Sequence, residues 1–220
     1  MGTLCRRLPL CVATRRSYES LVTPLSPRFP AAIAEIDAAN AQDPRLDTVA
    51  DTPRPREVVY SERMSESLSL LYPEASEALR IAARAQHICR WQIPRDKYPL
   101  GREGYNAWRS ACRDHHAVLI SAIMRRQGYA ENEIAQVVKI IRKEQLKRDP
   151  ESQALENVVG VVFVDHYLDE FVAAHKDYDE EKLADILRKT LRKMDPVGHA
   201  AALGLSLPEP TRRLIDVALK

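Results

Sequence analysis

The sequence predicts an all-α protein, with a single helical domain of about eight helices at residues 29–220. Apolar residues recur at helical spacing along most of this part, and prolines, glycines or capping residues bound the periodic segments. Only 7 glycines occur in 220 residues, which argues against a turn-dense all-β fold and against a nucleotide-binding fold led by glycine loops. No apolar run approaches the ~18–20 residues that span a bilayer, so no membrane segment is predicted.

The helices follow one another with short breaks. The first covers residues 29–40 and ends at a stretch rich in Asp and Pro, residues 40–55. Gly128 is expected to end the longest helix as its C-cap. The expected helices are therefore 29–40, 57–71, 76–91, 105–127, 131–146, 155–171, 182–192 and 208–220.

The most apolar segment, residues 155–171, could also be a buried strand, because five of the residues 158–164 are valines. Its uninterrupted length, its helical neighbours and the capping pair Asp149-Pro150 favour a helix. Burial outweighs the small propensity penalty of β-branched residues. A central buried helix is therefore predicted.

Charge and cysteine content limit the partners and the compartment. The chain has 33 basic and 31 acidic residues and a formal net charge of +2, without the basic surplus of a bulk nucleic-acid binder. Cys89 and Cys112 are isolated in the body of the chain, which is typical of free thiols in a reducing compartment.

Residues 1–28 differ from the rest and are predicted to be a disordered targeting segment followed by a proline-rich linker. Residues 1–18 contain no acid and four arginines, with Ser, Thr and small apolar residues between them. That composition is typical of a mitochondrial transit peptide, so the mitochondrial matrix is the expected location. A plastid or the cytoplasm is the alternative.

His87 is the residue most indicative of chemistry. It lies near the end of an alanine-rich helix, where Ala83, His87 and Arg90 share one face at i, i+4, i+7 spacing. Glu156 and Asp165 on the central helix can supply carboxylate partners. One interpretation is a buried His–carboxylate bond that locks two helices. The other is a catalytic pocket built from His87, Glu156 and Asp165.

Basic residues near these positions suggest that such a pocket holds an anion. Lys143 and Lys147 are four residues apart and can line one rim of a phosphate-sized site. The expected substrate-binding residues are Arg84, Arg90, Trp91, Lys143 and Lys147.

Five segments resemble an uncharacterised helical family of bacteria and fungi, domain of unknown function 4202. They are FPAAIAEIDAANAQDP, YSERM, AARAQHICRWQIPRDKYPLGREGYNAWR, RKEQLKRDPESQALENV and ILRKTLRKM. The resemblance runs from about Phe29 to the C-terminus and implies a helical fold without an assigned activity. Asn157 stands where the family pattern implies an acid, and Cys89 where a basic residue is common.

The order of features also resembles, more distantly, the HD phosphohydrolase superfamily. Those all-α enzymes use His and Asp residues on successive helices to bind a divalent metal, which activates water against phosphate esters. The resemblance implies corresponding positions at Glu62 or Arg63, at His87, and at Asp165 or Glu156.

In this chain the His-Asp doublet of those enzymes is broken, because Ile88 follows His87. A metal site therefore needs a further ligand, and His87, His116 and Asp165 form the candidate set for a possible divalent cofactor.

Two functions follow as hypotheses. The first is an HD-like protein that hydrolyses or binds a small anionic, phosphorylated metabolite. The alternative is a non-enzymatic accessory or scaffold subunit of a mitochondrial assembly, whose partner surface is the aromatic-basic loop 91–109. The sequence does not decide whether the protein is an enzyme.

Overall fold

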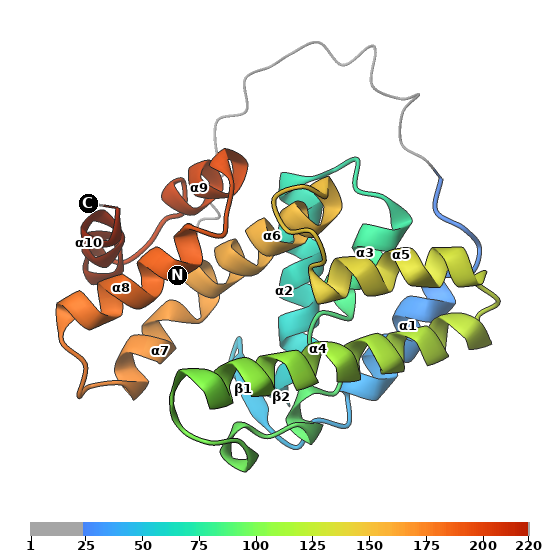
Figure 1. Cartoon of the computed structure of the whole chain (residues 1–220), viewed down its shortest axis with the longest axis horizontal. Helices are drawn as coiled ribbons and strands as arrows, with labels where there is room; N and C mark the ends of the chain where they lie inside the picture. Colours follow the sequence, from blue (N-terminus) through green and yellow to red (C-terminus); the bar gives the residue numbers. More distant parts are fainter. Residues whose placement is uncertain (1–23, 220) are drawn as a thin grey trace, which may run out of the picture.

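Helices make up nearly all the regular structure of residues 24–219, the part of the chain that the computed structural model describes (Figure 1). The predicted all-α class is confirmed. The α-helices are α1 Phe29–Asn40, α2 Arg56–Leu71, α3 Glu77–Arg84, α4 Gly101–Arg126, α5 Glu131–Arg142, α6 Pro150–His166, α7 Leu168–Ala174, α8 Glu180–Leu191, α9 Pro196–Leu203 and α10 Glu209–Ala218. Two short 3₁₀ helices, Arg90–Gln92 and Arg95–Lys97, lie between α3 and α4.

The central apolar segment forms α6, so the prediction of a helix rather than a strand is confirmed. Asp149 accepts a hydrogen bond from the Ser152 N–H at 2.8 Å, and Pro150 occupies the first turn. Gly128 follows α4 with a φ of +78°, as expected of a residue that ends a helix.

Two hydrophobic clusters share α6. Val158 and Val162 belong to a cluster formed with α1–α5, whereas Val161 and Val164 belong to one formed with α8–α10. Figure 1 shows α6 between these two groups of helices. A helix buried on most of its circumference must be apolar all round, which explains the run of valines.

The segment that carries His87 differs from the prediction. Helix α3 ends at Arg84, and residues 85–89 form a turn in which Cys89 has a φ of +51°. The Cys89 N–H donates to Oδ1 of Asn40 at 3.0 Å, which holds this left-handed conformation in place of another helical turn. The helix predicted at 76–91 therefore exists only as far as Arg84, and its predicted face of Ala83, His87 and Arg90 is wrong.

The helix predicted at residues 131–146 ends at Arg142 because Lys143 has a φ of +56°; Gln145 and Lys147 also have positive φ. The unpredicted elements are α9 and a hairpin of strands β1 Leu46–Val49 and β2 Thr52–Pro55. Residues 50 and 51 turn the hairpin with positive φ at both positions. The hairpin was not predicted because β2 contains two prolines, which are unfavourable in strands.

The predicted transit peptide lies largely in residues 1–23, outside the described residues. Of the predicted linker, Ser26 donates to Glu77, and Arg28 donates to the Gly128 carbonyl at 2.7 Å and pairs with Glu133 at 2.9 Å. Within residues 24–219, none of the helices combines the length and the apolar character that a bilayer crossing requires.

Candidate functional site

A cavity of about 510 Å³ lies among α2, the turn after α3, α4, the end of α5, and helices α6–α8. Seven cationic side chains line it but only two carboxylates, Glu57 and Glu156. We call it the basic cavity. Its cations are Arg45, Arg56, Arg90, Arg109, Arg113, Lys143 and Lys193.

Three of these cations have carboxylate partners. Arg45 pairs with Asp43 and Glu57, Arg56 with Glu170 at 3.0 Å, and Lys143 with Glu156. The other four, Arg90, Arg109, Arg113 and Lys193, form no ion pair with a carboxylate of residues 24–219. The cavity thus has an excess of positive charge that the described part of the chain does not neutralise.

The Lys143–Glu156 pair is buried, with side-chain exposures of 6% and 8%. Burial lowers the pKa of Lys143 despite the nearby Glu156 carboxylate. Burial also acts to raise the pKa of Glu156, but Lys143 outweighs it and the pKa is lowered. The left-handed backbone of Lys143 places this side chain where α5 ends, and such conformations are often found at functional sites.

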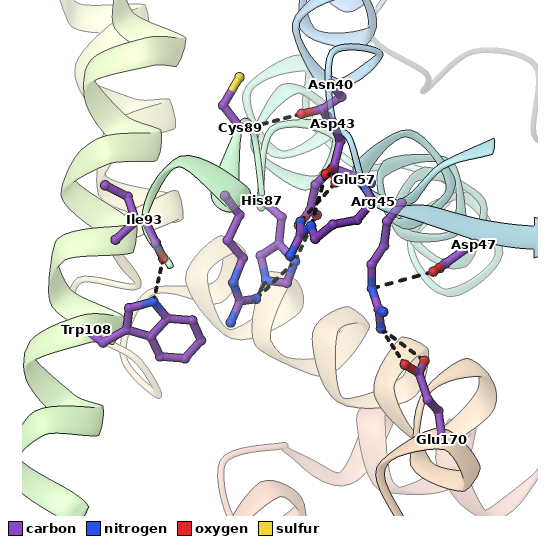
Figure 2. A network of polar contacts seen from close by, with 12 residues as sticks. Asn40, Asp43, Arg45, Asp47, Glu57, His87, Cys89, Ile93, Trp108 and Glu170 are labelled. Atoms are coloured by element: carbon purple, nitrogen blue, oxygen red, sulfur yellow. Dashed lines mark hydrogen bonds and ion pairs between the residues drawn. The ribbon is translucent and has the colours of Figure 1, made fainter. Parts of the chain in front are cut away.

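The imidazole of His87 is held on two sides. Its ring stacks on that of Tyr60, with centroids 3.9 Å apart and planes 11° apart. Its Nδ1 lies 3.5 Å from Oε2 of Glu57, and Arg45 donates to the other oxygen of Glu57 at 2.7 Å. Figure 2 shows His87, Glu57, Arg45 and Asp43 as neighbours in one polar network. This packing fixes the orientation of the ring.

Arg90 is the other neighbour of His87. Its Nη1 contacts Nε2 of the imidazole and lies 3.2 Å from Nδ1, and its guanidinium stands 4.7 Å from the Trp108 ring. The Trp108 Nε1–H donates to the Ile93 carbonyl at 2.8 Å (Figure 2). The indole is therefore fixed by its own hydrogen bond and supports the arginine by a cation–π contact.

Three buried polar atoms of lining residues have no hydrogen-bond partner within the described residues. They are Oε1 of Gln86, Nε2 of His116 and the hydroxyl of Tyr167. His116 is 2% exposed, and its ring centroid lies 6.0 Å from that of His87. Buried polar atoms are nearly always paired, so these three atoms are exceptions among the residues that line the cavity.

The structure brings together five of the residues that the sequence singled out. His87, Glu156, Arg90, Lys143 and His116 all line the basic cavity. Within it, however, His87 lies against Glu57, whereas Glu156 pairs with Lys143.

Four other candidates are not part of the cavity. Asp165 is exposed and faces His166 at 3.3 Å, because it lies at the end of α6 on the solvent side. Arg84 pairs with Asp37 at 2.7 Å, Trp91 packs on the first hydrophobic cluster, and the Lys147 ammonium donates to the Arg192 carbonyl at 3.0 Å. The grouping of these residues with His87 is therefore wrong.

The divalent metal that the HD resemblance implies does not fit these residues. Nowhere between residues 24 and 219 do three His, Cys, Asp or Glu side chains gather as a metal would require. His87 and His116 share the cavity, but Asp165 does not join them. The positions that the resemblance implies on α2, Glu62 and Arg63, are also not among the residues that line the cavity.

Sequence reasoning missed most of the residues that surround His87. Glu57 and Tyr60 come from one face of α2, and Arg109 and Arg113 share a face of α4 with the predicted His116 at i, i+4, i+7 spacing. That second pattern was visible in the sequence as a basic helix face. Asn157, where the family pattern implies an acid, donates to Tyr72 and Asp195 and does not line the cavity.

The aromatic-basic loop is only partly exposed. Trp91 and Tyr98 are half-buried, Trp108 lines the basic cavity, and Tyr105 is 45% exposed at the cavity's edge. Two of its four aromatic side chains, Tyr105 and Trp108, thus line the cavity, and Trp91 packs on the first hydrophobic cluster.

The chain matches the model of one protein family, described as a domain of unknown function (DUF4202), over residues 30–215. No curated protein matches it, and no solved structure does. These comparisons therefore do not support the distant resemblance to HD phosphohydrolases, which stays a prediction.

Proposed function

The chain belongs to the DUF4202 family, and we propose that it binds a small phosphorylated metabolite in the basic cavity. One observation carries the proposal: Arg90, Arg109, Arg113 and Lys193 line one cavity and have no carboxylate partner within residues 24–219.

Clustered cations repel one another. Unit charges a few ångströms apart interact by roughly 1–4 kcal/mol near a protein surface. Burial, followed by the nearby Arg109, lowers the pKa of Lys193. A ligand with two or more negative charges reverses this repulsion, and guanidinium groups bind phosphate oxygens bidentately.

The cavity also has room and apolar surface for the body of a metabolite. Its volume of about 510 Å³ lies within the usual range of small-molecule sites. Tyr105, Trp108, Phe163 and Phe171 supply aromatic surface beside the cations.

Calorimetric titration of the full chain with inorganic phosphate, pyrophosphate and a panel of nucleotides and sugar phosphates tests the proposal. We expect pyrophosphate or a panel member to bind, with affinity that falls as salt rises. Arg109→Gln and Lys193→Gln should each weaken binding about tenfold or more, since each removes a charge-assisted hydrogen bond.

Arg102→Gln is the matched control, because Arg102 is an exposed arginine of α4 that does not line the cavity. Equal losses in Arg102→Gln and Arg109→Gln would show a general charge effect. Wild-type chain that binds none of these compounds would overturn the proposal.

We also propose, from the composition of residues 1–18, that the protein enters the mitochondrial matrix. A fluorescent fusion of the full chain should localise there, and a fusion lacking residues 1–23 should not.

A further inference from the structure

The two nitrogens of His87 have different surroundings. Nδ1 lies 3.5 Å from a carboxylate oxygen of Glu57 and 3.2 Å from Nη1 of Arg90, whereas Nε2 contacts that same Nη1 more closely and has no carboxylate beside it among the described residues. A carboxylate beside Nδ1 favours the tautomer that has its proton there, which leaves the lone pair on Nε2. The reactive nitrogen is therefore the one beside an arginine without a carboxylate partner.

Glu57 is itself held in place. Arg45 donates to its Oε1 at 2.7 Å, and Asp43, which also binds Arg45, accepts from the Glu57 backbone N–H at 3.2 Å. Tyr60, one turn further along α2, stacks on the imidazole. The ring of His87 is thus fixed in orientation and tautomer before any ligand binds, which is what a nucleophile requires.

The protonation state agrees with this role. Burial lowers the pKa of His87 well below its usual value, and the positive charges of Arg90, Lys143, Arg45 and Arg109 lower it further. The imidazole is therefore neutral near pH 7, and its Nε2 lone pair accepts a hydrogen bond from Arg90 until a bound phosphate takes over that donor.

A phosphate oxygen bound to Arg90 would lie next to Nε2 of His87, because the guanidinium contacts that nitrogen. Arg109, Lys193 and Arg113 would neutralise the remaining oxygens of the phosphoryl group. Phosphoryl transfer depends mainly on such positioning and charge stabilisation. The described residues supply both the positioning and the positive charge, although no three His, Cys, Asp or Glu side chains among them cluster as metal ligands would.

We propose that Nε2 of His87 attacks the phosphorus of a phosphate monoester bound in the basic cavity, so that the protein is a phosphohydrolase acting through a phosphohistidine. This inference rests on the proposed function. A P–N bond forms as the P–O bond to the leaving group breaks. Water then attacks phosphorus, and the P–N electron pair returns to Nε2. Over both steps one water is consumed: its OH stays on phosphorus and its other proton reaches the leaving oxygen.

In this mechanism His87 is the catalytic residue, and Glu57 is a positioning residue that acts through it. Glu57→Gln should slow phosphorylation of His87 and change the pH profile of the reaction, because an amide no longer imposes one tautomer. The affinity for pyrophosphate should stay nearly unchanged. If Glu57 only maintained the shape of the cavity, its replacement would lower that affinity as well.

The test uses the full chain with p-nitrophenyl phosphate and with phosphoramidate, two small phosphoryl donors. We expect release of nitrophenolate and, after rapid alkaline quenching, a phosphoryl group on the peptide that contains His87, stable to base and labile to acid. His87→Asn should lose the adduct and lower turnover about 1000-fold or more, while pyrophosphate affinity stays within about threefold.

His166→Asn is the control, because His166 is an exposed imidazole on α6 that does not line the cavity, and it should form the adduct normally. Peptide mapping of the wild type alone also tests the inference, should His87→Asn fail to fold. Binding of pyrophosphate without labelling of His87 by either donor would overturn the inference and leave the proposed function intact. Absence of binding would overturn both.

Discussion

Two sides of the basic cavity differ in how their charges are balanced. On the Glu57 side of His87, an arginine and a carboxylate come as a pair: Arg45 binds Glu57, and Glu57 faces the imidazole, whereas Arg90 on the ring's other side has no carboxylate partner within residues 24–219. We call Arg45, Glu57 and His87 the histidine group. The cation group, Arg109, Arg113 and Lys193, has no such pairing within the described residues.

The difference indicates that the two sides have different roles. The histidine group is completed by the chain's own side chains, so its geometry exists without a ligand. The cation group needs an external anion to offset its charge, so its geometry depends on one. A cavity that combines both is suited to hold an anion against a fixed imidazole.

The largest expected effect concerns Glu156, the one carboxylate that lines the cavity beside the cation group. Glu156→Gln leaves the buried Lys143 ammonium without its partner. We expect the free energy of unfolding in urea to fall by about 3–5 kcal/mol, the usual result of breaking a buried ion pair from one side.

The double variant Lys143→Met/Glu156→Gln is the control, since it removes the buried charge as well. It should recover much of the loss. Exposed ion pairs contribute less than about 1 kcal/mol. If Glu156→Gln alone lowers the free energy of unfolding by no more than that, the buried pair does not stabilise the fold as we expect.

Lowering the pH is expected to have an intermediate effect on the free energy of unfolding. Burial lowers the pKa of both His87 and His116 well below their usual values, with nearby positive charges adding to the effect. The unfolded chain therefore binds protons at pH values where the folded protein does not. Stability is fully present above a pH of about 6.5 and should fall by about 1 kcal/mol per histidine between pH 6.5 and 5.5.

Thermal or urea unfolding at several pH values checks this. His116→Asn should reduce the slope of stability against pH, because it removes one of the two imidazoles whose pKa burial lowers. A slope that is the same in this variant and in the wild type would contradict the assignment of neutral, buried imidazoles.

The smallest expected effect is a gain in stability. Arg109→Gln and Lys193→Gln should raise the stability of the ligand-free protein by about 0.5–1 kcal/mol, because each removes one charge from a set of mutually repelling cations. Arg45→Gln, in the histidine group, should lower it, since Glu57 then loses its partner. Destabilisation by all three variants would contradict the difference between the two groups.

Helical periodicity and capping residues were enough to predict the fold class. Asp149-Pro150 and Gly128 act as expected because capping is local chemistry that the sequence records directly. The ends of α3 and α5 were missed because Cys89 and Lys143 adopt positive φ without being glycine. Such a conformation depends on tertiary partners, here Asn40 for Cys89, which are distant in the sequence.

The site, like the fold, was predictable only where the signal is local in the sequence. Its cationic character and His87 could be predicted, because the arginines and lysines are conspicuous in the sequence. The partner of His87 could not, since Glu57 is thirty residues earlier and only the packing of α2 against the turn after α3 brings the two together. Asp165 was predicted beside Glu156 as a carboxylate of the central helix, but it lies on the solvent side of that helix, which the sequence does not show.

The central claim is that an anion binds beside His87 and against the cation group. Titration of the full chain with pyrophosphate, followed by NMR of the histidine side chains, tests it most directly. We expect the His87 and His116 resonances to shift and the pKa of His87 to rise with the anion bound, while the resonances of the exposed His166 stay in place. Binding that leaves His87 and His116 unshifted, or that moves the other histidines instead, would contradict it.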